Sequence, residues 1–357
     1  MSFLPAPRRL GALFPRLKLP TVELGHFPTA VEKLPFGDDL YIKREDQAGD
    51  LYGGNKVRKL ELLLGDAVSR KKKRVITLGA LGSHHALATT IYARRLGLEA
   101  ELVLYPQPLD PHVIDDLLLD HVFGAKLHLA RHPATASALG LALAAKAART
   151  TAFIPPGGSS ALGALGHVEG ALELAEQVEK GELPEPDVLV CAFGTGGTVA
   201  GLALGLALAG LKTRVLAVRV VEAITTRALL RELLNGARRV LTRRGVPASK
   251  LPRNALDRIE ICPDQLGKGY GHPTEGSRRA KEIFAGAGVT LETTYTGKAG
   301  AAFLELARKA PGRPLIFWHT FSSVDLAPRL SEADPEGLPR AFHRVLRQAG
   351  VLPPATS

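Results

Sequence analysis

The sequence is poor in cysteine and has no long hydrophobic run. Cys191 and Cys262 are its two cysteines, too few for a disulfide framework or a cysteine-rich metal site. Free cysteines are typical of a reducing compartment, so we expect a cytoplasmic protein. The longest apolar run, Val199–Leu211, is shorter than the roughly 20 residues that cross a bilayer. Residues 1–17 contain arginines but no apolar segment with a small-residue cleavage site, so we expect neither a secretory signal nor a membrane partner.

Aromatic residues are also scarce, and this bears on the basic charge. Lys and Arg number 46 against 35 Asp and Glu, a net charge of +11 that invites a nucleic-acid hypothesis. Aromatic residues make up 5% of the chain, however, which leaves little material for base stacking. The basic cluster Arg70–Arg74 lies between a helical pattern and a strand, where a solvated turn is expected. We therefore expect no nucleic-acid partner and a general attraction for small anionic substrates.

Hydrophobic residues make up 45% of the 357 residues, which excludes a disordered chain and allows about two domains. Short apolar, β-branched runs alternate with Ala- and Leu-rich helical patterns, which predicts an α/β fold with parallel sheets. No long linker divides the chain, so we expect the second domain to be inserted in the first. The predicted strands are Asp39–Lys43, Arg74–Leu78, Glu101–Tyr105, Lys126–Ala130, Ala152–Pro155, Asp187–Phe193, Arg214–Val221, Arg258–Cys262 and Leu315–His319. The predicted helices are Leu60–Ser69, His85–Leu96, Ala136–Ala148, Gly163–Lys180, Val199–Leu211, Ala223–Leu234, Glu275–Ala285 and Ala299–Lys309.

The first stretch with chemical potential is KREDQAGDLYGGNKVRKLE, residues 43–61. Gly53 and Gly54 permit a turn that other residues resist, and Asn55 and Lys56 follow at the start of a predicted helix. The positive end of the helix dipole disfavours a charged lysine, and Schiff-base chemistry needs a neutral amine. A turn followed by a surface lysine is the alternative.

The second stretch is GALGSHHA, residues 79–86, between a strand and a helix. Free N–H groups at this junction make a cradle for a carboxylate or phosphate, and Ser83 is either part of it or a helix cap. His84 and His85 are adjacent, so they face different directions on a helix and are poor candidates for a shared metal.

The third stretch is CAFGTGGTVAG, residues 191–201, which follows a buried strand and opens a helix. Its glycines let the backbone approach an anion, and phosphate is the expected guest. Val199 departs from the dinucleotide fingerprint, but Glu222 ends the next strand where a ribose-binding acid would lie, so a nicotinamide enzyme stays an alternative. Three later segments place Tyr, Thr or His beside glycines or at strand ends: residues 268–277 (KGYGHPTEGS), 294–299 (TYTGKA) and 318–323 (WHTFSS).

Together these segments resemble the pyridoxal-phosphate enzymes of fold type II, the group similar to the tryptophan synthase β subunit. Within them they resemble the 1-aminocyclopropane-1-carboxylate deaminase and D-cysteine desulfhydrase family. The similarity extends from about Leu40 to His319, and GGNKVRKLE is its most specific part. It implies two open twisted parallel-sheet domains with pyridoxal 5′-phosphate in the cleft between them, and a homodimer. The large cofactor-binding domain would comprise residues 1–57 and 166–357, and the small inserted domain residues 58–165.

The resemblance implies a role for each motif. Lys56 would bind the cofactor as a Schiff base, with Asn55 close to the ring. Ser83 matches the active-site serine, and Tyr270 and Tyr295 match two tyrosines that face the substrate. The cofactor phosphate would be held by the following residues: Lys59, Gly194, Thr195, Gly196, Gly197 and Thr198.

Three departures from the family pattern bear on the substrate. The deaminases have glutamate where Thr296 stands, at the position that faces the pyridine nitrogen; a neutral threonine favours expulsion of a thiolate over opening of a cyclopropane. His84 and His85 replace an Asn-Gln pair, so the contact of that asparagine with the 3-oxygen of the cofactor is lost or made by the His84 imidazole. Phe321 replaces a glycine and is expected to narrow or reshape the pocket.

We therefore predict a pyridoxal-phosphate-dependent lyase that catalyses α,β-elimination from a cysteine-like, D-configured amino acid, giving a 2-oxo acid, ammonia and sulfide. The alternatives are 1-aminocyclopropane-1-carboxylate deaminase or a deaminase of another β-substituted amino acid. A third alternative, of another class, is a protein that binds an amino acid and the cofactor without turnover. The expected catalytic residues are Lys56, Ser83, Tyr270 and Tyr295, and no metal is expected.

Overall fold

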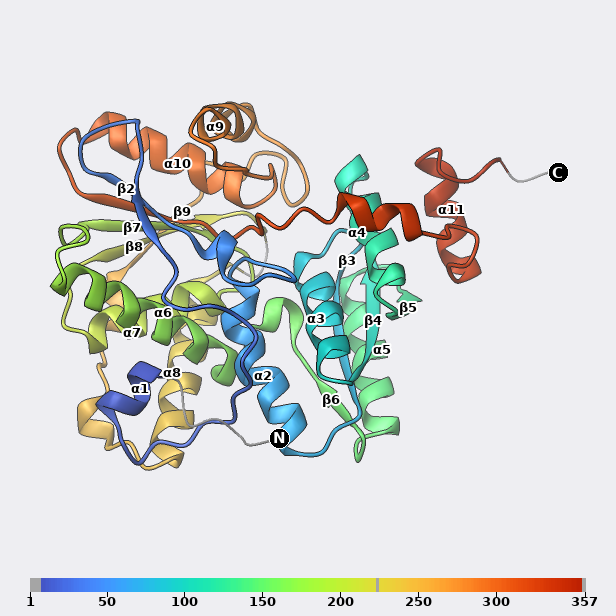
Figure 1. The fold of residues 1–357 in the computed structure, drawn as a ribbon, viewed down its shortest axis with the longest axis horizontal. Helices are drawn as coiled ribbons and strands as arrows, with labels where there is room; N and C mark the ends of the chain where they lie inside the picture. The colour runs from blue at the N-terminus through green and yellow to red at the C-terminus, as the bar shows by residue number, and fades with distance from the viewer. Residues whose placement is uncertain (1–7, 223–224, 355–357) are drawn as a thin grey trace. The chain divides into compact units, whose positions relative to one another are not determined.

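The computed structural model describes residues 8–222 and 225–354, and the chain forms two compact units (Figure 1). The first unit comprises the described residues up to Leu63 and the segment Ser159–Ser323. The second comprises Leu64–Gly158 and the described residues from Val324 onward. Residues 1–7 lie outside the described residues; they are part of the N-terminal segment in which we expect no secretory signal. Ala223, the first residue of a predicted helix, also lies outside them.

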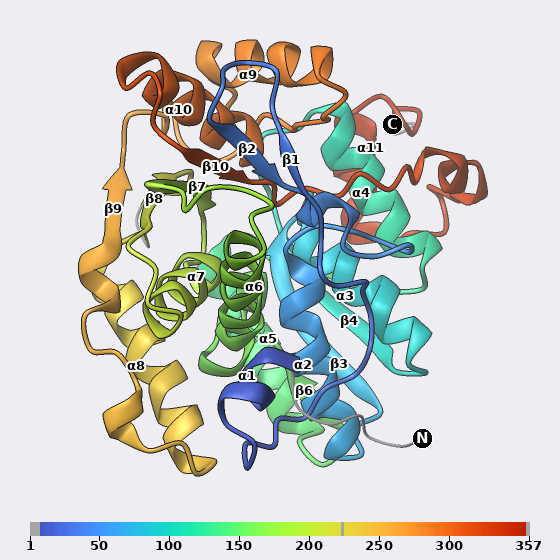
Figure 2. The ribbon, with the colours of Figure 1, turned by 60° about the vertical axis from the view of Figure 1, so that its left-hand side comes forward.

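The first unit is built on a six-stranded sheet with the strand order β1-β2-β10-β7-β8-β9 (Figure 2). The short β1 is antiparallel to β2, and the other neighbours are parallel. The strands are β1 (Val31–Lys33), β2 (Leu40–Lys43), β7 (Val188–Phe193), β8 (Arg214–Arg219), β9 (Ile259–Cys262) and β10 (Leu315–Trp318).

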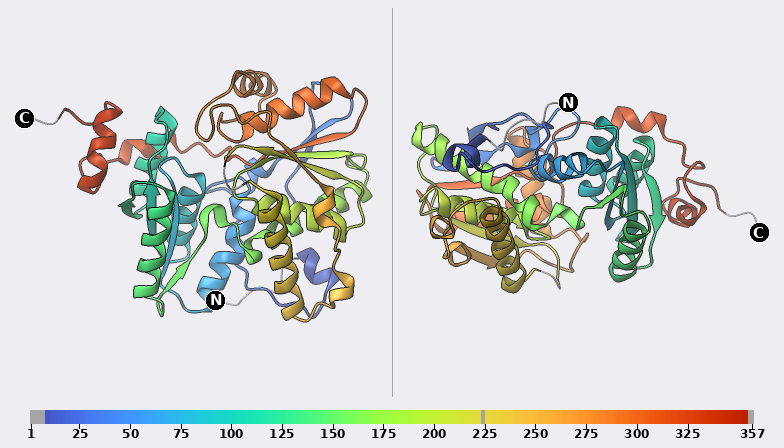
Figure 3. Two further views of the ribbon diagram at one scale, coloured as in Figure 1. Left: turned by 180° about the vertical axis from the view of Figure 1, so that it is seen from behind. Right: turned by 90° about the horizontal axis from the view of Figure 1, so that it is seen from below.

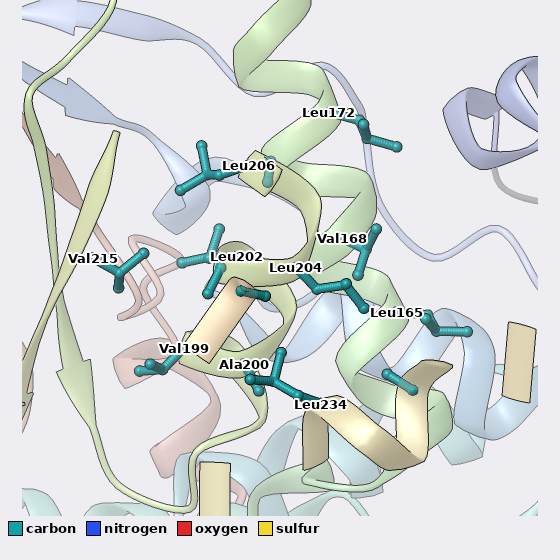
Figure 4. Close-up of a cluster of buried hydrophobic side chains, with 14 of the residues drawn as sticks. Leu165, Val168, Leu172, Val199, Ala200, Leu202, Leu204, Leu206, Val215 and Leu234 are labelled. Atoms are coloured by element: carbon teal, nitrogen blue, oxygen red, sulfur yellow. The ribbon is translucent and has the colours of Figure 1, made fainter. Parts of the chain in front are cut away.

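Helices cover both faces of this sheet because its strands are apolar on both sides. Along β7, Leu189 and Cys191 point into one hydrophobic cluster, whereas Val188 and Val190 point into another. The first cluster contains side chains of α1 (Arg8–Leu13), α6 (Ala161–Glu179), α7 (Gly197–Leu208) and α8 (Arg227–Arg243), and Figure 4 shows its centre. The second contains side chains of α9 (Glu275–Gly286) and α10 (Thr296–Lys309). Short 3₁₀ turns at Glu45–Gln47, Ala248–Lys250 and Ala255–Arg258 complete the unit.

The second unit has a four-stranded parallel sheet with the order β5-β4-β3-β6, seen from two further directions in Figure 3. Its strands are β3 (Arg74–Ala80), β4 (Glu99–Tyr105), β5 (Lys126–Leu129) and β6 (Thr151–Phe153). Its helices are α3 (His84–Arg95), α4 (Pro111–Val122), α5 (Pro133–Lys146) and α11 (Arg340–Gln348), with 3₁₀ turns at Pro156–Gly158 and Ala327–Glu332. Helix α2 (Lys56–Ser69) begins in the first unit and ends in the second.

The division into units differs from the predicted domains at the C-terminus. The segment from Val324 onward, assigned to the large domain from the sequence, belongs to the second unit. Its apolar residues Phe342 and Leu346 share a hydrophobic cluster with Leu102 and Leu117 of β4 and α4, which explains the difference. The other borders, after Leu63 and after Gly158, lie six or seven residues from the predicted ones.

Each predicted strand belongs to one of the two sheets, and the α/β fold class is confirmed. Helices α1, α4 and α11 and strand β1 were not predicted. Among the described residues, none of the helices combines the length and the apolar character that crossing a membrane requires.

A buried ion-pair network fixes the start of α2 in the first unit. The Arg58 guanidinium contacts the carboxylates of Glu45 (2.7 Å) and Glu173 (2.8 Å), and the Lys43 ammonium contacts Glu173 at 2.6 Å. Burial alone would raise the pKa of Glu173, but Arg58 and Lys43 outweigh it and lower the pKa to about 2. The network therefore joins β2, α2 and α6 through one charged carboxylate.

Removing this carboxylate should destabilise the protein strongly. We expect Glu173→Ala to lower the free energy of unfolding by about 3–5 kcal/mol, because it leaves buried cations without their anion. Glu260→Ala is the matched control: its carboxylate is 63% exposed and 3.7 Å from Arg214, so the loss should be below about 1 kcal/mol. Guanidinium denaturation of both variants measures the difference, and equal losses would contradict the network's role.

Candidate active site

Lys56 is the first residue of α2, and the turn before it requires glycine. A Cβ on Gly53 would lie 1.8 Å from the Asp46 carbonyl oxygen. Gly54 has a φ of +81°, and a Cβ there would meet the Thr320 carbonyl oxygen at 2.8 Å. The pair of glycines in the sequence is thus explained by close backbone packing, and it places Asn55 and Lys56 at the mouth of the helix.

The Lys56 amine donates a hydrogen bond to Asn55 Oδ1 at 2.7 Å, and Asn55 Nδ2 donates to Thr198 Oγ1 at 2.8 Å. Removal from water lowers the pKa of Lys56 to about 8, with Glu292 acting in the opposite direction. The helix N-terminus disfavours the ammonium as well. A lysine of this kind carries a neutral, nucleophilic amine in part of the molecules at neutral pH.

Lys59 follows one turn later and is fully buried beside an anion cradle. Its Nζ lies 3.4 Å from Ser159 Oγ, and burial together with the charge of Lys56 lowers its pKa well below the usual value. Ser159 Oγ is also hydrogen-bonded to Thr195 Oγ1 (2.7 Å) and accepts the Gly197 N–H (3.0 Å). These contacts join α2 to the glycine-rich loop 194–198.

The glycine-rich loop forms the N-terminus of α7. Gly196 is the N-cap residue with a φ of +84°, and it has no side chain with which to cap the helix. A Cβ on Gly197 would lie 2.7 Å from Ser159 Oγ and 3.1 Å from Lys59 Nζ. Helix N–H groups, hydroxyls and an amine therefore converge on a space that only glycine leaves open, which suits an anion.

Tyr270 and Tyr295 meet in the same unit. Their hydroxyl oxygens are 2.8 Å apart, and their rings cross at 75° with centroids 5.7 Å apart. A Cβ on Gly194 would lie 3.3 Å from the Tyr295 ring, so this ring lies against the glycine-rich loop. The two tyrosines, 25 residues apart in the sequence, are thus next to the predicted phosphate cradle.

Charged side chains hold the tyrosine loops in place. The Lys298 ammonium donates to the carbonyl oxygens of Leu266 (2.8 Å) and Gly269 (2.9 Å). Glu222, which we considered above as a ribose-binding acid, accepts the Tyr270 N–H at 3.1 Å and so holds the loop that carries Tyr270. Burial lowers the pKa of Lys298, but Glu222 and Glu292 oppose the shift.

Glu292 is a site residue that sequence reasoning missed. Its buried carboxylate accepts the N–H groups of Thr294 (2.6 Å), Tyr295 (3.0 Å) and Thr296 (2.6 Å), and the Thr296 hydroxyl at 2.9 Å. It therefore caps α10 and orients Thr296. A carboxylate a few residues before a predicted helix was the available signal.

The segment after β10 supports the Lys56 turn. Ser322 Oγ accepts the Gly53 N–H at 2.8 Å, and the Thr320 carbonyl accepts the Asn55 N–H at 3.2 Å. His319 is buried, and burial lowers its pKa to about 4, so it is neutral at neutral pH. That Phe321 reshapes a substrate pocket stays a prediction.

Ser83, His84 and His85 lie in the second unit, at the start of α3. Ser83 is the N-cap and accepts the Ala86 N–H at 3.3 Å. His85 is buried with its Nε2 3.1 Å from Thr77 Oγ1. The His84 ring faces α4, with Nε2 3.2 Å from His112 Nε2. The predicted substrate contact of Ser83 and cofactor contact of His84 stay predictions.

Comparison with known proteins identifies the family. Residues 22–320 match the model of the pyridoxal-phosphate dependent enzymes. The chain belongs to this family. The bifunctional D-cysteine desulfhydrase/1-aminocyclopropane-1-carboxylate deaminase of Arabidopsis thaliana is 33% identical over 336 residues, covering 87% of this chain and 80% of the relative.

Two further relatives agree with this placement. The D-cysteine desulfhydrase of Salmonella schwarzengrund is 33% identical over 321 residues, 85% of this chain and 94% of its own. The crystal structure of an ACC deaminase homologue superposes with a TM-score of 0.75 at 33% identity, covering 91% of this chain and 99% of that one. These findings confirm the predicted family, fold type II, the cofactor and the function class of a pyridoxal-phosphate-dependent lyase or deaminase.

The residues around Lys56 and Lys59 fit pyridoxal phosphate. The cradle at Gly197 would be filled by a Cβ, the Lys59 amine lies beside it, and Lys56 precedes Lys59 by one turn of α2. A phosphate dianion placed there would offset the cost of keeping these amines charged away from water. The aldehyde of the same cofactor requires a neutral amine, which the lowered pKa of Lys56 provides.

The cradle can be tested by closing it. We expect Gly197→Ala to weaken binding of pyridoxal phosphate to the apoprotein about 10- to 100-fold. The methyl group would displace Ser159 and Lys59, whose side chains are expected to form hydrogen bonds with the cofactor phosphate. Gly286→Ala is the control, since a Cβ there meets nothing within 4 Å. Fluorescence titration measures both affinities, and unchanged binding to Gly197→Ala would contradict the cradle.

The pKa of Lys56 predicts a pH profile. With a pKa of about 8, about a tenth of the amines are neutral at pH 7 and about half at pH 8. The rate at which apoprotein captures pyridoxal phosphate should therefore rise about fivefold from pH 7 to 8 and level off above about pH 9. The rate is followed by absorbance, and Nα-acetyl-lysine serves as the reference, whose rate should rise about tenfold from pH 7 to 8. If the capture rate instead rose about tenfold per pH unit up to about pH 10, Lys56 would have the pKa of an ordinary lysine.

Proposed function

We propose that this protein catalyses β-elimination from a cysteine-like amino acid, with D-cysteine as the preferred substrate. One molecule each of cysteine and water would give pyruvate, ammonia and hydrogen sulfide. The observation that carries the proposal is the neutral-amine environment of Lys56 beside Asn55 and the glycine cradle, together with the names of the relatives that are about a third identical.

Residues of this chain are proposed to bind and orient the two reactants. Lys59, Ser159 and the N–H groups at the start of α7 would hold the cofactor phosphate, and Asn55 would lie beside the ring. The N–H groups at the start of α3, capped by Ser83, would receive the substrate carboxylate. When bound, pyridoxal phosphate supplies an electron sink that stabilises negative charge at the substrate Cα.

Proton transfer is proposed to fall to Lys56 and the tyrosine pair. The Lys56 amine, once displaced by the substrate amine, would take the proton from Cα. The hydroxyls of Tyr295 and Tyr270 share one hydrogen bond at 2.8 Å, so either can pass a proton to the leaving group or from Cα. General acid–base assistance of this kind typically contributes about 10²–10⁴-fold in rate.

Thr296 supports elimination over cyclopropane opening. Its hydroxyl donates to Glu292 at 2.9 Å, so the residue proposed to face the pyridine nitrogen is a neutral, oriented hydroxyl. A neutral partner makes a shallower electron sink, which is sufficient for the departure of a thiolate. Deamination of 1-aminocyclopropane-1-carboxylate is the second candidate, because the Arabidopsis relative is named for both activities.

We also propose that the protein is a cytoplasmic homodimer that binds no nucleic acid. The family resemblance supports the dimer. The two free cysteines, one of them buried, support a reducing compartment.

The function is tested with an amino-acid panel. D-cysteine should yield sulfide and pyruvate in equal amounts, and Lys56→Ala should abolish both products and the borohydride-reducible adduct that mass spectrometry finds at residue 56. Lys281→Ala, an exposed lysine of α9, is the control and should keep full activity. Product from 1-aminocyclopropane-1-carboxylate alone would replace the preferred substrate by the second candidate. Spectral changes with amino acids but no product would indicate a binding protein.

A further inference from the structure

Three potential metal ligands converge in the second unit. His84 is the first residue of α3, and His112 and Asp116 lie one turn apart on α4, which packs against α3 (Figure 1). His84 Nε2 is 3.2 Å from His112 Nε2, and Asp116 Oδ2 is 3.2 Å from His84 Nδ1 and 3.7 Å from His112 Nε2. The three ligand atoms lie within 4.8 Å of one another.

These separations suit a small divalent cation. Ligands about 2.0–2.1 Å from a tetrahedral zinc ion are about 3.4 Å apart. His112 Nε2 is 3.2 Å from His84 Nε2 and 3.7 Å from Asp116 Oδ2, and these two separations bracket this value. Residues four apart on a helix, as His112 and Asp116 are, present their side chains on one face, and His84 from the facing helix supplies the third ligand.

The environment of Asp116 also favours a cation. Its side chain is 5% exposed, and its Oδ2 accepts no hydrogen bond from the described residues while two imidazoles face it. Asp120, one turn further along α4, is fully buried and likewise has an Oδ2 without a hydrogen-bond donor among the described residues. The His112 side chain is 42% exposed, which leaves a path by which an ion can enter.

We propose that His84, His112 and Asp116 form a zinc-binding site, with a fourth position open to water. Two imidazoles and one carboxylate are nitrogen and oxygen ligands that suit Zn²⁺, and three protein ligands are typical of an open site. The ion would link α3 to α4 through His84, the residue that follows Ser83. The competing arrangement, two imidazoles sharing a proton with Asp116 as acceptor, needs no metal.

Binding is measured on untagged holoenzyme without amino acids, after dialysis against a chelator. Cobalt(II) serves as the spectroscopic probe, because its visible d–d bands report nitrogen and oxygen coordination. We expect one cobalt per chain, displaced by one equivalent of zinc. His112→Ala and Asp116→Asn should each weaken zinc binding by at least the roughly 10–100-fold that is typical for the loss of a residue that only supports a ligand, because each loses one of three protein ligands. His121→Ala, a histidine further along α4, is the matched control and should bind as the unchanged chain does.

The melting temperature is a second readout, which does not depend on the cobalt d–d bands. Zinc should raise the melting temperature of the unchanged chain and of His121→Ala, but not that of His112→Ala, because a bound ligand stabilises the folded state by mass action. His112 is partly exposed, so its replacement is expected to leave the fold intact. No zinc on the unchanged chain, or equal binding by His112→Ala, would overturn the site and leave the proton-sharing arrangement.

Discussion

Two lysine amines in the first turn of α2, that of Lys56 half-buried and that of Lys59 buried, are the constraint on which the rest of this structure depends. Lys56 and Lys59 lie at the positive end of the helix dipole, where a charged amine is disfavoured. Arg58 stands between them in sequence, and its charge is matched by Glu45 and Glu173. The carboxylates therefore match the charge of the guanidinium, whereas removal from water lowers the pKa of both amines. This arrangement is what makes a phosphate-bearing aldehyde the fitting guest.

The remaining charged groups of the site keep its loops in position. Lys298 binds two carbonyl oxygens of the Tyr270 loop, Glu222 binds the Tyr270 N–H, and Glu292 caps α10 at Tyr295 and Thr296. Loops carry few packing contacts of their own, so such hydrogen bonds to charged groups are the forces that hold the two tyrosine hydroxyls together. The precise position of these side chains is thus set by residues that need not touch a substrate.

The sequence was most informative where function and backbone conformation coincide. The glycines at positions 53, 54, 196 and 197 are required by close contacts or a positive φ, and such requirements are visible as motifs. Strands were recognisable because both faces are buried, whereas β1 is short and largely exposed. Helix α4 was overlooked although Asp110 caps it and Pro111 begins it. Ser159 acts through contacts with Thr195 and Gly197, and the packing of α11 in the second unit depends on apolar residues distant in sequence, so neither was accessible to local patterns. Glu292, by contrast, acts on the three residues that begin α10, and its local signal was overlooked.

The two adjacent histidines lie at the start of α3, and their different surroundings follow from helix geometry. Neighbouring helical residues point about 100° apart, so His84 and His85 cannot bind one ion together. Helix α3 instead directs His85 to Thr77 in the interior and His84 to α4, where it contacts His112 and Asp116. The replacement of an Asn-Gln pair by two histidines is therefore two separate changes. One alters the packing behind β3, and the other creates a polar connection between α3 and α4 next to Ser83, so substitutions at the two positions should be analysed independently.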